Sequence, residues 1–255
     1  MKRKPVDVKL EDWILRDRVF RVARGWSNSE LRWIGQLISG DVVNVSAYRD
    51  EDKQGAYYRG YFPHASSYTL TNFKQSMSGF QGEAGEIFLD LELGLPESLQ
   101  GKFDCVFNHT TLEHVYEFRK AFANLCGMSR DLVVVVVPWL QENHTDYGDY
   151  WRFSPSAVAR LFDENGFTNA YISWNDDPGT SVYVLGVGTR HPERWVQKFP
   201  FSVDPHSANF LRLPQNAAGR YALPSSTLRP FLRKTIEMAK RVTGRGRKDP
   251  NEDSA

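Results

Sequence analysis

The sequence is poor in cysteine and has no long apolar segment. Only Cys105 and Cys126 occur among its 255 residues, which excludes a small disulfide-stapled fold, and we expect two reduced, buried thiols. No apolar run approaches the roughly 20 residues that a membrane-spanning helix needs. The opening lysines are not followed by the apolar core of a signal peptide, so we expect a cytoplasmic protein.

An excess of charge of one sign is also missing. Lysine and arginine total 32 against 31 acidic residues, for a formal net charge of +1, so the chain as a whole does not attract nucleic acid. The charged segment 49–62 contains Asp50, Glu51 and Asp52 beside its basic residues. We therefore expect no nucleic-acid partner.

One basic stretch, residues 228–248, departs from this balance. Its apolar positions have helical spacing, and lysines and arginines lie around them. Two interpretations stay open: a solvated helix with a frayed tail, or a basic amphipathic helix that contacts anionic lipid at the membrane periphery or a protein partner.

Glycine is absent where a nucleotide-binding fold usually has it. The segment GDVVNVSAYRDEDKQG has no glycine between Gly40 and Gly55. A nicotinamide-dependent oxidoreductase needs a glycine-rich pyrophosphate turn that leads into a helix. The missing turn argues against that class, although the β-branched residues before the loop still predict a core strand.

The rest of this region alternates strand and helix signals. Ser27 or Ser29 can cap a helix, Ser154 can cap another that has Pro155 at its first position, and valines 133–137 predict a central strand covered on both faces. Strands that alternate with helices indicate a doubly wound α/β fold with a mostly parallel sheet.

The boundaries of this fold follow from short connections and composition. The segment NDDPGT between the last two strands is too short for a helix, so we expect these strands to close the sheet as an antiparallel pair. From about Arg190 the composition shifts toward Pro, Arg, Asn and Ser. We divide the chain into an N-terminal lead-in (1–26), a core domain (27–190) and a C-terminal extension (191–255).

Two segments of the second half resemble one enzyme family. FDCVFNHTTLEHVYEFRKAFANLCGMSRDLVVVVVPW and HTDYGDYWRFSPSAVARLFDENGF are similar to class I S-adenosylmethionine-dependent methyltransferases, in particular to the branch that modifies glycans and small molecules. In that branch a strand that begins with Phe-Asp precedes Leu-Glu-His-Val, and a later strand ends in Val-Pro. The resemblance covers residues 31–188 and implies a Rossmann-like methyltransferase fold that binds S-adenosylmethionine.

The resemblance also implies a cofactor site at the strand ends. Its residues are Asn44, Ser46, Tyr48, Asn72, Asp90, Leu91 and His109. In the family an acid and two glycines occupy the first three positions, because glycine lets the backbone adopt positive φ and approach the cofactor. A tyrosine there would crowd the methionine part of the cofactor.

The other positions depart from the family less. Asn72 is on or near the acid that accepts the ribose hydroxyls; its amide can still bond a hydroxyl but lacks the charge. Asp90 matches the acid that commonly bonds the adenine amine, with Leu91 beside it, and His109 lines the cleft. Two functions stay open: methyl transfer with a substituted loop, or an inactive methyltransferase-like protein that serves as a partner, a regulator or a binder of another ligand.

The acceptor site is expected on the loop after the valine strand. His144 is the candidate general base, and Asp146 or Asp149 would orient its imidazole or bind acceptor hydroxyls. Aromatic residues of this loop either stack on a sugar acceptor or pack against the core. We expect no metal, because His109 and His114 lack the i, i+4 spacing of a zinc motif. The alternative that stays open is an extended segment in which His144 and Asp146 join them; some sugar-modifying relatives of the family depend on magnesium or manganese.

Overall fold

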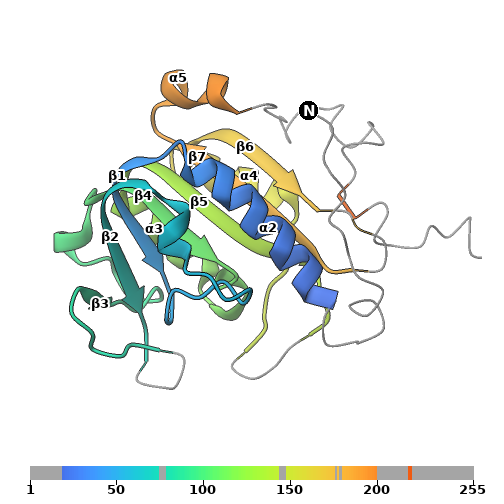
Figure 1. Ribbon diagram of the computed structural model, residues 1–255, viewed down its shortest axis with the longest axis horizontal. Helices are drawn as coiled ribbons and strands as arrows, with labels where there is room; N and C mark the ends of the chain where they lie inside the picture. The colour runs from blue at the N-terminus through green and yellow to red at the C-terminus, as the bar shows by residue number, and fades with distance from the viewer. Residues whose placement is uncertain are drawn as a thin grey trace, which may run out of the picture.

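The computed structural model describes residues 19–74, 79–143, 148–175, 177, 180–199 and 218–219. Seven strands form one sheet (Figure 1), in the order β3-β2-β1-β4-β5-β7-β6. Neighbouring strands pair in parallel from β3 to β5, whereas β7 is antiparallel to both β5 and β6. The doubly wound sheet and its antiparallel closing pair are therefore confirmed. The strands are β1 (Ser39–Val45), β2 (His64–Asn72), β3 (Glu86–Phe88), β4 (Phe103–His109), β5 (Ser129–Leu140), β6 (Thr168–Trp174) and β7 (Val182–Thr189).

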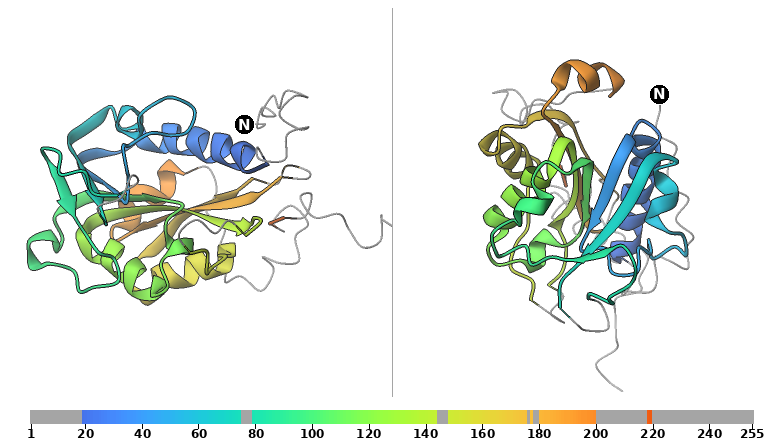
Figure 2. Two further views of the ribbon diagram at one scale, coloured as in Figure 1. Left: turned by 90° about the horizontal axis from the view of Figure 1, so that it is seen from below. Right: turned by 90° about the vertical axis from the view of Figure 1, so that its left-hand side faces the viewer.

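Helices cover both faces of the sheet (Figure 2). Helix α2 (Val19–Gly35) lies on one face, and α3 (Phe118–Met128) and α4 (Pro155–Glu164) lie on the other. Between β1 and β2 the described chain has no α-helix, only the single 3-10 turn η2 (Tyr58–Tyr61). The remaining short elements are η3 (Glu97–Leu99), η4 (Leu112–His114), α5 (Pro192–Trp195) and η5 (Val196–Lys198).

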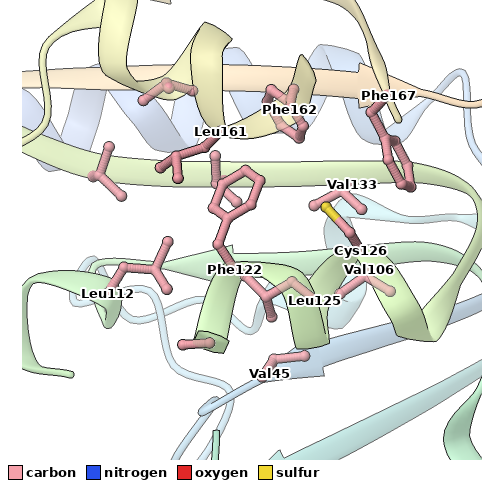
Figure 3. Packing of buried hydrophobic residues seen from close by; sticks show 14 of the residues in the cluster. Val45, Val106, Leu112, Phe122, Leu125, Cys126, Val133, Leu161, Phe162 and Phe167 are labelled. Atoms are coloured by element: carbon pink, nitrogen blue, oxygen red, sulfur yellow. The ribbon is translucent and has the colours of Figure 1, made fainter. Parts of the chain in front are cut away.

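The valine run of β5 divides its side chains between two cores. Val133, Val135 and Val137 pack with α3 and α4, whereas Val134 and Val136 face the α2 side, as expected for a strand buried on both faces. Figure 3 shows the first core. A Cβ on Gly188 would lie 2.3 Å from the Phe162 ring, so this glycine lets α4 approach β7 closely.

Helix α4 begins as predicted, but α2 does not. Ser154 accepts a hydrogen bond from the Ala157 N–H at 3.2 Å and caps α4. Helix α2 includes Val19 and runs through Ser27 and Ser29, so neither serine is an N-cap. Their hydroxyls bond carbonyls of the preceding turn instead, an alternative that serine side chains have inside helices.

The packed part of the chain continues beyond residue 190. Trp195 and Phe199 are buried against the α2-side core, and the Trp195 indole N–H donates to Asp131 at 2.9 Å. The basic stretch 228–248 lies outside the described residues. Within the part of the chain that the structure describes, no helix has the length and apolarity to cross a membrane.

Candidate functional site at the carboxyl edge of the sheet

Strands β1 to β5 end at one edge of the sheet, where the order of the strands reverses. β1 and β4 are neighbours, and the chain winds away from them in opposite directions. Ligands of open α/β sheets bind at such a switch point, outside the carboxyl ends of the strands. Val45 pairs with Asn108 there.

The loop after β1 keeps a left-handed backbone without glycine. Ser46 has φ of 58° and Tyr48 has φ of 50°, at the two positions where the resemblance described above implies glycines. Such conformations cost about 1 to 2 kcal/mol for an ordinary residue. The loop therefore has, at two residues with side chains, the backbone conformation that glycine would favour.

Asn72 holds this loop from the end of β2. Its amide oxygen accepts from the Tyr48 N–H at 2.6 Å, and its amide nitrogen donates to the Tyr48 carbonyl at 3.0 Å. The same nitrogen donates to Glu86 at 2.6 Å. Burial acts to raise the pKa of Glu86, but this bond and the N–H groups of residues 81–83 lower it overall. A ribose would have to compete with these contacts for Asn72.

Asn44 is buried on the α2 side of β1. Its amide donates to Asp50 at 2.9 Å, and the Tyr68 hydroxyl donates to the same oxygen at 2.7 Å. The other Asp50 oxygen accepts from the Arg59 N–H at 3.0 Å and from its Nε at 3.3 Å. In this structure Asn44 supports a buried carboxylate.

Asp52 is a second buried carboxylate of the same connection. Burial acts to raise the pKa of Asp52, but hydrogen bonds from Tyr61, Ala56 N–H and Gln54 N–H, together with the charge of Arg32, lower it overall. The charged connection between β1 and β2 is thus built into the core.

Asp90 and Leu91 follow β3. One Asp90 oxygen accepts from the Glu92 N–H at 2.9 Å and shapes a tight turn. Leu91 is buried, and its carbonyl accepts from the Asn124 amide of α3 at 2.9 Å. Their roles as cofactor contacts stay predictions.

His109, at the end of β4, has both ring nitrogens engaged. Nε2 lies 2.9 Å from the Ser27 hydroxyl, and Nδ1 lies 3.1 Å from the Thr110 hydroxyl. Arg24 donates to Thr110 at 2.9 Å, and Ser27 donates to the Arg24 carbonyl at 3.0 Å. Because the Ser27 hydroxyl donates its proton to the Arg24 carbonyl, it can only accept from His109 Nε2. These bonds therefore fit a neutral ring that carries its proton on Nε2. Burial and the charge of Arg24 hold the pKa of His109 well below its usual range.

The loop after β5 is described only in part, because His144 and Asp146 lie outside the described residues. Asp149 is bound by the Arg152 guanidinium through both oxygens, with Nη2 to Oδ2 at 2.7 Å. The backbone N–H groups of Tyr150 and Trp151 donate to the Glu113 carbonyl at 2.8 and 3.3 Å. These bonds fix the loop to η4.

Tyr150 and Trp151 differ in packing. Tyr150 is 53% exposed, whereas the Trp151 ring lies 4.7 Å from Phe118, centroid to centroid. The first side chain is available for stacking, and the second packs at least partly against the core.

Sequence reasoning missed Asn108, the one polar residue between Phe103 and His109 apart from Asp104. It is fully buried, and its amide nitrogen donates to the Val45 carbonyl at 2.9 Å. Its Oδ1 has no hydrogen-bond partner within the described residues. An amide inside an apolar strand was the signal that could have identified it.

Arg24 and Glu113 were missed as well. Arg24 Nε and Glu113 Oε2 are buried, and both lack hydrogen-bond partners among the residues of the described ranges. Burial raises the pKa of Glu113 to about 8. In these same ranges, no group of three or more His, Cys, Asp or Glu residues is placed to hold a metal ion.

A surface pocket of about 450 Å³ adjoins the β1 loop and is not lined by Arg24, Asn108 or Glu113. Tyr48, Arg59, Leu70 and Glu86 are among its lining residues, so it opens between the β1–β2 and β2–β3 connections. The chemistry of the carboxyl edge gives the better candidate, because buried polar atoms without partners meet there.

Comparison with solved structures agrees with the strand order. The C-methyltransferase domain of citrinin polyketide synthase superposes with a TM-score of 0.50 over 70% of this chain and 55% of that one, at 11% identity. The chain has the class I methyltransferase fold.

Two other solved methyltransferase-fold structures are similar. A candidate methyltransferase from Bacillus halodurans C-125 has a TM-score of 0.49 at 10% identity, covering 65% of this chain and 99% of that one. The Burkholderia thailandensis 1,6-didemethyltoxoflavin-N1-methyltransferase with bound S-adenosylhomocysteine has a TM-score of 0.46 at 16% identity, covering 74% and 92%. Neither a family model nor a curated protein matches the sequence.

Proposed function

We propose that this protein is an S-adenosylmethionine-dependent methyltransferase that O-methylates a sugar, a surface glycan or a related small molecule. The cofactor would bind at the switch point between β1 and β4. When bound, it supplies an electrophilic methyl group on a sulfonium.

The observation that carries this proposal is the buried amide of Asn108. A buried acceptor without a partner costs about 1 to 3 kcal/mol, and here it lies between the ends of β1 and β4. The amino group of the cofactor's methionine part is a donor that suits it. The positive φ of Ser46 and Tyr48 supports the same location, because the loop keeps the backbone that the family uses beside the cofactor.

We assign the remaining cofactor contacts from the positions of the residues at the ends of the strands. Asp90 and Leu91 follow β3 and would hold the adenine, and Asn72 would reach the ribose. Tyr48 N–H and Asn72 are already bonded to each other, so these two residues would give the loop its shape as well as contact the ligand. His109 would form the buried wall below the reacting atoms.

The acceptor side would be provided by the loop after β5. His144 would take the proton from the acceptor hydroxyl, with Asp146 as its orienting partner. Asp149 would act through Arg152, to which it is bound. The exposed Tyr150 ring offers a flat surface for a sugar ring.

One observation favours the alternative, a fold that has kept its scaffold but not methyl transfer. All three hydrogen bonds of the Asn72 amide go to Tyr48 and Glu86, where the family has a free acid for the ribose. In that case the protein would act as a partner, a regulator or a binder of another ligand.

Calorimetric titration with S-adenosylhomocysteine tests the two functions. We expect saturable binding in the micromolar range, and about tenfold weaker binding, or about 1.4 kcal/mol, for Asp90→Ala. Asp41→Ala, at the opposite edge of the sheet, should bind like the wild-type protein. Absence of binding at millimolar ligand would reject the methyltransferase proposal and favour the alternative.

A further inference from the structure

Arg24 of α2 is a half-buried arginine that forms no ion pair with any described carboxylate. One of its Nη atoms donates to Thr110 at 2.9 Å, and its positive charge acts on the nearby hydroxyls of Tyr58 and Tyr183. Nε is left buried without a partner among the described residues. A charged group held this way normally has a counter-charge nearby, because burial of an unpaired charge is costly.

Glu113 of η4 is an acidic candidate, because the charge of Arg24 acts on it, but it does not supply that counter-charge. It is 1% exposed, and its closest ionic neighbour is His114, at 3.8 Å. Because burial raises the pKa of Glu113 to about 8, the carboxyl group is mainly neutral at pH 7. A neutral carboxyl is a hydrogen-bond donor, and its Oε2 atom has no partner within the described ranges.

Arg24 and Glu113 belong to one neighbourhood. Arg24 bonds Thr110, which lies two residues before η4, the turn that contains Glu113, and the charges of both groups act on Tyr183 at the start of β7. Tyr183 pairs with Pro138 near the end of β5, and Arg24 bonds Thr110 just after β4. The two groups therefore lie near the carboxyl ends of β4 and β5.

We propose that Arg24 and Glu113 form an oxyanion-binding position that receives a carboxylate or phosphate group of the acceptor. Arg24 supplies the positive charge and Nε–H, and Glu113 supplies a neutral O–H. This inference rests on the proposed function, whose acceptor it narrows to an anionic small molecule or glycan. It leaves the cofactor's own contacts at Asn108 and Asp90 unchanged.

Inorganic phosphate is the probe. It is titrated into the protein saturated with S-adenosylhomocysteine, at constant ionic strength with chloride as the balancing ion. We expect saturable binding that Arg24→Gln weakens by about tenfold or more, since a charge-assisted contact is lost. Arg24→Lys should weaken it less, because the charge remains. Arg21→Gln is the matched control: this exposed residue lies one turn earlier on α2 and should leave binding unchanged.

Glu113→Gln tests the second group. Glutamine is neutral and keeps an N–H donor, so phosphate affinity should stay within about twofold of the wild-type value. If Glu113→Gln instead binds phosphate about tenfold more tightly, Glu113 is an anion that repels phosphate, and its assigned role is overturned. Wild-type affinity in Arg24→Gln would overturn the site as a whole.

The cofactor's carboxylate is the other possible source of an oxyanion. The second arm compares S-adenosylhomocysteine with 5′-methylthioadenosine, which lacks the amino-acid part. Arg24→Gln should change the affinity for both by less than about twofold. Selective loss of S-adenosylhomocysteine would assign Arg24 to the cofactor and overturn the acceptor proposal.

Failure of the proposed function would look different from failure of the oxyanion position. If the proposed function fails, S-adenosylhomocysteine will not bind at all, whereas phosphate titrated alone will still bind in an Arg24-dependent way. Near-ultraviolet circular dichroism of each variant identifies any variant that has lost its packing, and Arg24→Lys then decides the result.

Discussion

Two regions of this protein bury polar groups in opposite ways. In the connection between β1 and β2, both Asp50 and Asp52 have every carboxylate oxygen hydrogen-bonded. Around the carboxyl end of β4, Arg24, Asn108 and Glu113 each keep a buried polar atom without a partner in the described chain.

This difference distinguishes buried polar groups that stabilise the fold from buried polar groups that face a ligand. A fully bonded buried network rigidifies the chain and needs nothing more, whereas a partly bonded one costs free energy until a ligand completes it. We therefore assign the β1–β2 connection to maintenance of the loop and the β4 end to binding.

The largest expected effect on stability is in the β1–β2 connection, where the buried carboxylates are fully hydrogen-bonded. Asp50→Ala removes the carboxylate that Asn44, Tyr68 and Arg59 share, and should lower the free energy of unfolding by about 3 to 5 kcal/mol. Urea denaturation measures it. Asp41→Ala is the control, because this aspartate pairs with Arg130 in an exposed position and should cost less than about 1 kcal/mol. Equal losses would remove the distinction between the two kinds of carboxylate.

The second effect concerns Glu113, near the carboxyl end of β4, and depends on pH. Burial raises the pKa of Glu113 in the folded protein to about 8, well above the usual value for a glutamate carboxyl group, roughly 4.3. The neutral Glu113 carboxyl group therefore makes its full contribution to the stability of the folded protein in acid, and this contribution is lost as the pH rises toward 8. Relative to Glu113→Gln, the wild-type protein should lose about 1.4 kcal/mol of unfolding free energy per pH unit across this interval. A constant difference between pH 5 and pH 8 would show that the carboxyl group is not buried in its neutral form.

The smallest effect probes the strained backbone of the β1 loop. Ser46→Gly relieves a positive φ and should stabilise the protein by up to about 1 kcal/mol. Ala47→Gly, at the next residue and without a positive φ, should destabilise it by about 0.5 to 1 kcal/mol. The opposite signs are the test, and thermal unfolding of the two variants side by side resolves them.

The fold was more accessible to sequence analysis than the site. The valine run, the Ser154 cap and the short last connection each reflect local chemistry, and each predicted its element. Helix α2 was misjudged because serine hydroxyls can bond carbonyls within a helix as well as cap its start.

The site depends on contacts between distant segments. Asn72 was predicted to face a ribose, but whether it bonds Tyr48 instead is decided by the path of the β1 loop. Glu113 was missed, because its burial and raised pKa arise only when α3, β5 and the segment after residue 148 pack around η4. The sequence pattern alone contains neither fact.

The most direct test of the central claim is titration of S-adenosylhomocysteine into Asn108→Leu, with Asn44→Ala as the matched buried amide on the bonded side. We predict about tenfold weaker binding for Asn108→Leu and wild-type affinity for folded Asn44→Ala. Wild-type affinity in Asn108→Leu, or an equal loss in both variants, would contradict the assignment of the β1–β4 switch point as the ligand site.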